Sequence, residues 1–211
     1  MTSVAETRRD YDYTALSHVL RRAVVLGVIT AVVVVALAFV TRLMDGMLET
    51  LVGAVVLLFG ITAVTVLPGL WTRARTIEGI AGAAGIGLAA TVVFLLIDVA
   101  LLQPLGVYTN RWREVGGGSN WWYHPVWWMV GTFLPWMGAL IVANRARRGR
   151  SDSVGGVMGI AIVATLIVGA LAVVAGFPGA GWNLSTFGVA FLPGIAVAAL
   201  VSSLGRSTAS G

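Results

Sequence analysis

The chain has 211 residues, of which 58% are hydrophobic and only 11% are charged, and its formal net charge is +5. A soluble domain carries about 25% charged residues, so this composition excludes an ordinary soluble protein and indicates a polytopic membrane protein. The chain has no cysteine, which excludes disulfides, thiol catalysis and cysteine-ligated metals.

Six apolar runs are long enough to cross a bilayer, for which a helix needs roughly 20 residues. The sequence therefore predicts an all-α integral membrane protein. Its transmembrane domain is expected at 21–205, after a polar tail at 1–20 and before a short tail at 206–211. In chain order the predicted spans are 22–42, 48–70, 79–105, 125–144, 154–176 and 186–204.

All basic residues are arginines, and they are divided unevenly between the two sides that six spans create. Eleven fall in the tails and in the second and fourth connections, whereas Arg42, Arg111 and Arg113 fall on the other side. Because cytoplasmic segments are rich in basic residues, we expect both termini in the cytoplasm. The arginines lie at the ends of apolar runs, which favours this topological role over nucleic-acid binding. Arginine without lysine, with abundant alanine and valine, is typical of GC-rich bacteria, so we expect the bacterial inner (plasma) membrane.

The spans also show signs of internal repetition. The second, fourth and sixth carry VLPG at 66–69, FLPW at 133–136 and FLPG at 191–194. The third and fifth spans align from Gly85 and Gly159. The pattern predicts three helical hairpins as a threefold repeat, which in membrane folds often surrounds a pseudo-symmetry axis. The alternative is that helices rich in Ala, Val and Gly resemble each other through composition alone.

Pro68, Pro135 and Pro193 lie within these Leu-Pro motifs. Proline removes a backbone donor and can kink a helix, so three bends are expected. The bends either open a cavity on the axis or are ordinary features of membrane helices.

Asp98 is the single acidic residue clearly inside a predicted span, in the segment FLLIDVALL. A carboxylate at this depth usually faces the bundle interior or a water-filled cavity. Two interpretations remain open. Asp98 either binds a proton or cation, or pairs with Arg42, Arg111 or Arg113 near the outer boundary.

The longest connection, at 106–124, is expected outside and is rich in tryptophan, arginine and glycine. Aromatic belts form at membrane boundaries, and arginine with aromatics also anchors protein interfaces. Two interpretations of this connection therefore remain open: an aromatic belt at the membrane boundary, or a contact with a partner or lipid headgroup. The residues assigned to this contact are Arg111, Trp112, Arg113, Trp121, Trp122, Tyr123 and His124.

No arrangement typical of an enzyme is present. Ser119 and His124 are close in sequence, but no nucleophile motif accompanies them. His18 and His124 fall on opposite sides and cannot share a metal. We expect no catalytic residue, metal or cofactor, and no part of this chain that binds a nucleotide.

The segment YTNRWREVGGGSNWWYHPVWWMVGTFLPW at 108–136, together with the lysine-free hairpins, resembles the conserved multi-pass membrane proteins of mycobacteria. It is similar in particular to the small accessory subunits of mammalian-cell-entry (MCE) type lipid importers. That resemblance implies a helper bound to the permease of an ATP-driven lipid importer. Its partners would be membrane lipids and other integral membrane subunits. The resemblance transfers no functional residue.

Two functions from different classes follow from the residues. The first is a non-enzymatic accessory subunit of a larger inner-membrane complex. The alternative is a small-solute or ion transporter or channel that is kinked at the Leu-Pro sites and uses Asp98. Transporters more often carry several intramembrane polar residues, which favours the subunit.

Overall fold

The computed structural model describes residues 12, 15–108 and 123–204, and all regular secondary structure within these ranges is helical. The elements are α1 (Leu16–Leu43), α2 (Gly46–Trp71), α3 (Ile77–Ile97), the π-helical turn η1 (Asp98–Leu102), α5 (Tyr123–Arg147), α6 (Val154–Val174) and α7 (Leu184–Ser203). With α3 continued through η1, the described ranges contain six helices long and apolar enough to cross a membrane. The predicted class, a six-span all-α membrane protein, is confirmed.

The helices extend past several of the predicted boundaries. Helix α1 begins at Leu16, inside the segment predicted as a polar tail, and α5 continues to Arg147. Helical hydrogen bonds satisfy the backbone beyond the hydrocarbon region as well as within it, so a helix can continue past the apolar run from which it was predicted. Arg145 and Arg147 in the last turn of α5 also complement the negative end of the helix dipole.

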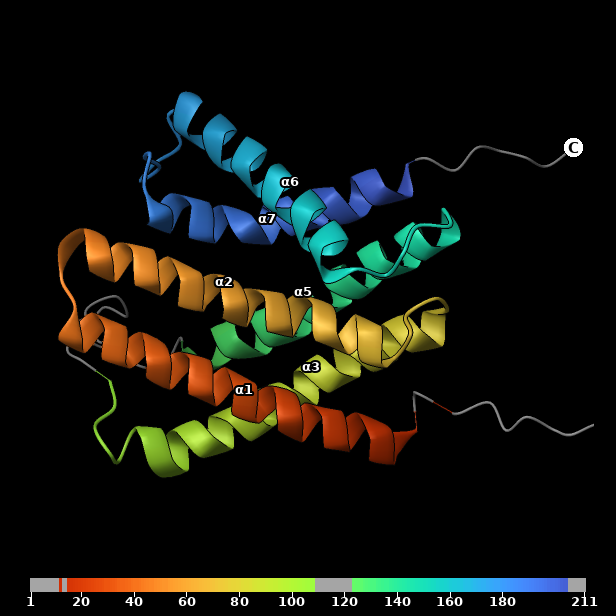
Figure 1. The fold of residues 1–211 in the computed structure, drawn as a ribbon, viewed down its shortest axis with the longest axis horizontal. Coiled ribbons are helices and arrows are strands. Elements are labelled where there is room, and N and C mark those ends of the chain that lie inside the picture. Colours follow the sequence, from red (N-terminus) through yellow and green to blue (C-terminus); the bar gives the residue numbers. More distant parts are fainter. Residues whose placement is uncertain (1–11, 13–14, 109–122, 205–211) are drawn as a thin grey trace, which may run out of the picture.

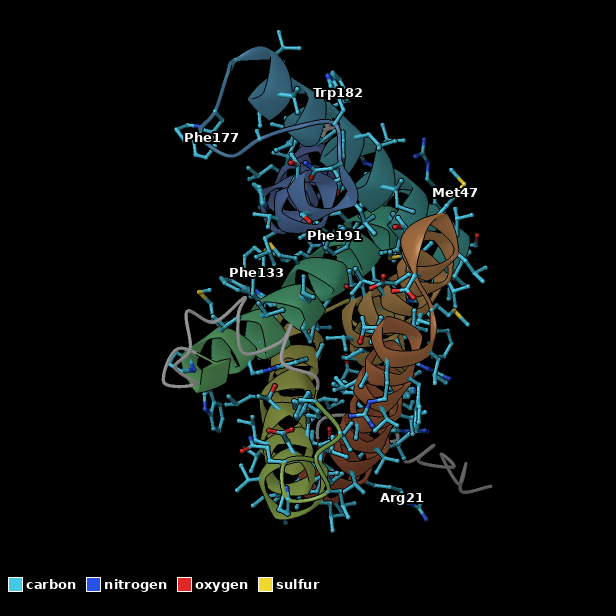
Figure 2. The ribbon with its side chains drawn as sticks, turned by 90° about the vertical axis from the view of Figure 1, so that its left-hand side faces the viewer. Arg21, Met47, Phe133, Phe177, Trp182 and Phe191 are labelled. Atoms are coloured by element: carbon cyan, nitrogen blue, oxygen red, sulfur yellow. The ribbon has the colours of Figure 1, made fainter. Side chains whose placement is uncertain are left out.

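Successive helices run in opposite directions, so α1 begins and α7 ends at the same end of the bundle (Figure 1). Helices α1, α2, α3 and α5 pack against one another, and α5 also contacts α7. Helix α6 packs mainly on α7. The connection between α6 and α7 lies at the opposite end (Figure 1), and its residues Phe177 and Trp182 are exposed (Figure 2).

The largest buried cluster joins α2, α5, α6 and α7 around Val66, Ile141 and Ile195, none of which is exposed. Two smaller clusters connect α1 with α3, one of them around Phe94. Val64 of α2 packs against the largest cluster and one of the smaller ones, and Trp127 of α5 packs against the cluster around Phe94.

Glycines set the distance between the packed helices. A Cβ atom on Gly138 of α5 would overlap with the carbonyl oxygen of Thr65 in α2, and one on Gly131 would overlap with the Thr91 hydroxyl of α3. Gly27 of α1 approaches the carbonyl of Ala90, which a Cβ would meet at 2.9 Å. Small residues allow such approach in membranes, where apolar burial does not drive helices together.

The three Leu-Pro prolines lie inside α2, α5 and α7, as the sequence predicted. Each lies at or beside a close contact between helices. The Pro135 ring occupies the space that a Cβ on Gly87 would need, and Gly69 and Gly194 follow the other two prolines at similar contacts. None of the three lines the cavity described below, so their positions fit packing rather than the opening of that cavity.

We predict that Gly138→Ala lowers the free energy of unfolding by about 1–3 kcal/mol, because the added methyl forces α5 away from the Thr65 carbonyl. Reversible SDS unfolding in mixed micelles, followed by circular dichroism, measures the change. Gly159→Ala is the matched control, since a Cβ there meets nothing within 4 Å. It is expected to be neutral or to stabilise by up to about 1 kcal/mol through helix propensity. Equal effects at both sites would contradict this account.

Candidate functional site

Asp98 lies where α3 changes into the π-helical turn η1. Its side chain is fully buried, with 0% exposure. The wider turn is closed by a hydrogen bond from the Gln103 amide to the Asp98 carbonyl oxygen, at 2.9 Å. Single π-helical turns within α-helices occur frequently at functional sites, and here the turn carries the carboxylate.

Two neutral side chains from the same chain segment donate to the Asp98 carboxylate. Gln103 Nε2 donates to Oδ2 at 2.6 Å, and the Tyr108 hydroxyl donates to Oδ1. A buried carboxylate without such donors would carry a large desolvation penalty. The cluster therefore ties the end of α3 to the turn that follows it.

Arg42, at the end of α1, binds this turn through its backbone. Its Nη2 atom donates to the carbonyl oxygens of Gly106, at 2.9 Å, and Val107, at 3.3 Å. Gly106 adopts φ +62°, a conformation that favours glycine. Arg42 thus binds the carbonyl of Val107, the residue that precedes Tyr108 in the chain. The pairing of Arg42 with Asp98 that the sequence left open is not among its described contacts. The alternatives Arg111 and Arg113 lie outside the described residues.

The predicted outer contact is largely beyond the described ranges. Arg111, Trp112, Arg113, Trp121 and Trp122 fall outside them. Tyr123 and His124 form the first turn of α5, but their side chains are outside the description as well. The choice between an aromatic belt and a partner contact stays a prediction.

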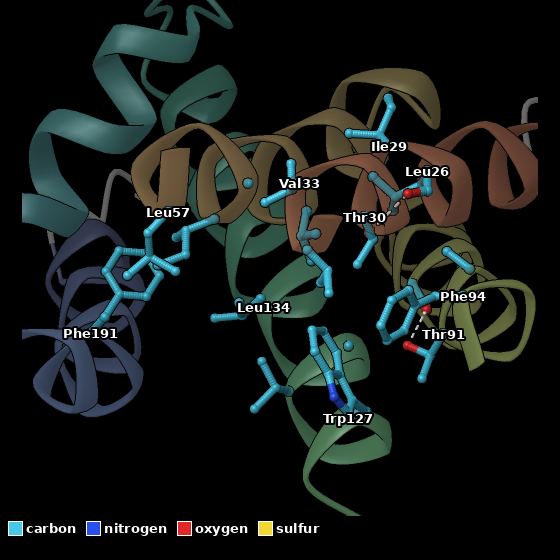
Figure 3. Close-up of a pocket in the computed structure, with 18 of the residues that line it drawn as sticks. Leu26, Ile29, Thr30, Val33, Leu57, Thr91, Phe94, Trp127, Leu134 and Phe191 are labelled. Carbon is cyan, nitrogen blue, oxygen red and sulfur yellow. Dashed lines mark hydrogen bonds between the residues drawn. The ribbon is translucent and has the colours of Figure 1, made fainter. Parts of the chain in front are cut away.

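A cavity of about 320 Å³ lies between α1, α2, α3, α5 and α7 (Figure 3). Its wall is almost entirely hydrocarbon. The hydroxyls of Thr30 and Thr91 donate within their own helices, to Leu26 O at 2.9 Å and to Gly87 O at 3.0 Å. Asp98 is not part of the wall.

The cavity lies at mid-height in the bundle and extends toward the end where α5 begins. Trp127, in the second turn of α5, lines it at this end, and its ring centroid is 4.5 Å from that of Phe94. Val189 of α7 also lines the cavity although it is 70% exposed. The space therefore reaches the lateral surface of the bundle beside α7.

The arginine-rich end carries polar contacts between connections. Arg75, between α2 and α3, pairs with Asp152, between α5 and α6, at 3.1 Å. The Arg22 guanidinium lies 5.1 Å from the centre of the Trp71 ring. Such cation–π and ion-pair contacts suit a membrane boundary, where arginine stems pack and their heads stay polar.

Within the part of the chain that the structure describes, no group of three or more His, Asp or Glu residues is placed to hold a metal ion. Sequence reasoning offered a cavity only as one interpretation of the proline bends, and none of those prolines lines the cavity that the structure shows. Its only signal was the presence of small residues in facing spans, among them Gly60, Gly87 and Gly188.

Comparison with known proteins found no matching family model, no matching curated protein and no matching solved structure. The function is therefore inferred from the chain's own residues.

We predict that Tyr108→Phe lowers the free energy of unfolding by about 1–3 kcal/mol, because the buried Asp98 carboxylate loses a donor. The same substitution should cost less in an Asp98→Ala background, where the acceptor is already gone. A double-mutant cycle in mixed micelles measures the difference, expected at about 0.5–3 kcal/mol. Additive effects would show that the two side chains do not stabilise each other.

Proposed function

We propose that this chain is a non-enzymatic accessory subunit of a larger bacterial inner-membrane complex that supports lipid import across the cell envelope. The observation that carries the proposal is the hydrocarbon wall of the interhelical cavity. A route for ions or polar solutes needs polar groups along it, because every charge or unpaired polar group in the membrane interior is costly. A space lined in this way suits apolar molecules.

The surroundings of Asp98 favour the subunit over the alternative of a small-solute or ion transporter that uses this residue. The carboxylate is buried away from the cavity and accepts hydrogen bonds from Gln103 and Tyr108. A carboxylate that binds and releases a transported ion needs contact with the path of that ion. The described geometry instead supports a structural role at the end of α3.

The proposal includes three helical hairpins related as a threefold repeat. Thr91 and Thr165, at matching positions of the aligned third and fifth spans, donate to the carbonyls of Gly87 and Ala161, at 3.0 and 2.7 Å. Each threonine also packs against a glycine of the Leu-Pro helix that follows it in the chain, α5 in one case and α7 in the other. The matching threonine hydrogen bonds support repetition, whereas the two glycines, four residues before Pro135 and one residue after Pro193, do not correspond in the aligned motifs.

The proposal also places both termini in the cytoplasm. The first described helix begins and the last one ends at the same end of the bundle as the connections that carry Arg73, Arg75 and Arg145–Arg150 (Figure 1). Basic residues gathered at one end are typical of the cytoplasmic side.

We predict that the tagged chain, purified from its native membrane in mild detergent, brings down other integral membrane subunits in stoichiometric amounts. Mass spectrometry identifies them. Asp98→Asn should leave this complex and the uptake of a labelled lipid by intact cells unchanged, because asparagine keeps the shape and an acceptor oxygen. A chain that purifies alone or only with itself would contradict the proposal. Intact assembly with complete loss of activity in Asp98→Asn would favour transport by this chain.

If the outer loop makes the partner contact, replacing Trp121 and Trp122 by alanine should reduce recovery of the partner at least about tenfold, as expected for aromatic anchors. Trp182→Ala is the control, because Trp182 is 71% exposed and lies in a different connection, between α6 and α7. Recovery that is unchanged in the double variant would assign the loop to a membrane-boundary belt.

A further inference from the structure

We infer that the interhelical cavity is a binding site for one hydrocarbon chain of a membrane lipid. The inference deepens the proposed function and rests on it for its biological purpose, although the site itself belongs to this chain. What the geometry contributes is a space enclosed by five helices, apolar on all sides and open laterally beside Val189.

The chemistry of the wall selects an apolar occupant. A buried water needs about two to four polar partners, and the two threonine hydroxyls in the wall already donate to their own helices. Apolar cavities without such partners stay dry and accept apolar ligands. Trp127 adds an aromatic ring at the end of the cavity nearest the outer loop.

The surroundings supply that occupant. Leu26, Val33 and Leu57 place the cavity in the middle of α1 and α2, where the medium around the protein is lipid hydrocarbon. An unfilled void forfeits the dispersion contacts of its wall, and a chain that enters restores them. A lipid chain gains little from leaving water here, because it is already in hydrocarbon, so the fit to this space drives binding.

Size and arrangement point to a single chain rather than a whole lipid. The volume of about 320 Å³ is at the lower end of the range of small-molecule sites, which runs from about 300 to 1,000 Å³. Helix α7 packs on α5 and α6, and its Gly188–Leu192 segment faces α1 and α2 across the cavity. The hydrocarbon chain of the lipid enters through this side, and the headgroup of the lipid stays outside the bundle.

Gly188 provides a way to close the site without touching the core. A Cβ atom there meets nothing within 4 Å, so a larger side chain extends into open space. Gly159 of α6 is equally open but does not line the cavity. The pair gives a filled-cavity variant and a control with the same substitution.

The test uses the purified full chain in vesicles of phosphatidylethanolamine and phosphatidylglycerol, with a trace of phospholipid that carries a diazirine in its acyl chain. After irradiation, mass spectrometry maps the adducts. In the wild type, labelling of Trp127 and Leu192 should exceed that of Leu58 and Phe59, which are exposed on the bundle surface. If Trp127 and Leu192 are labelled no more than Leu58 and Phe59, the proposal is overturned. This comparison needs only the wild-type protein.

Gly188→Leu should reduce the cavity labelling at least about threefold, because leucine takes the space that the chain occupies. Gly159→Leu should leave it unchanged, and labelling of Leu58 should be the same in both variants. Unchanged cavity labelling in a folded Gly188→Leu chain overturns the inference. A second result also overturns the inference. In the native complex, the cavity would lose its lipid label and gain a cross-link to another protein, which would mean that a partner helix fills it.

The two proposals can fail separately. If the protein purifies alone and the photoreactive lipid labels its cavity, the lipid site is supported and the subunit role is rejected. A stoichiometric complex whose chain shows no labelling of the cavity keeps the subunit role and rejects the lipid site.

Discussion

The fold depends on the close approach of α5 to its neighbours. Gly131 and Gly138 leave room for the Thr91 hydroxyl of α3 and the Thr65 carbonyl of α2, positions that no larger residue allows. In a membrane, burial of apolar surface gives no drive for association, so the quality of packing determines which helices stay together. Because α5 also contacts α7, this one helix connects the two halves of the bundle.

The cavity is a consequence of the same packing. Helices α1, α2 and α3 are held near α5, directly or through each other, while α7 reaches the bundle through α5 and α6. The α7 segment that lines the cavity has small or moderate residues at Gly188 and Val189 and larger ones at Phe191 and Leu192. The space that these residues leave unfilled lies beside the glycine contacts of α5, because Gly131 also lines the cavity.

The sequence was sufficient for the six spans, since length and mean hydropathy decide them. It was not sufficient for the partners of Asp98. Charge complementarity directed attention to arginines, whereas Gln103 and Tyr108, five and ten residues further along, supply the described donors. A π-helical turn brings Gln103 round to the carboxylate, and no residue pattern predicts that turn. The cavity escaped prediction for another reason: its volume depends on the distances between helices, which emerge only from packing.

Asp98 and the cavity are connected through α3. Phe94 lies one turn before Asp98, and its ring contacts Trp127 at the start of α5. The segment that leaves α3 is held by Tyr108 on Asp98 and by Arg42 on the carbonyls of Gly106 and Val107. The segment that follows α3 and the start of α5 are thus both held by the same stretch of α3, one through the buried carboxylate and the other through the contact of Phe94 with Trp127.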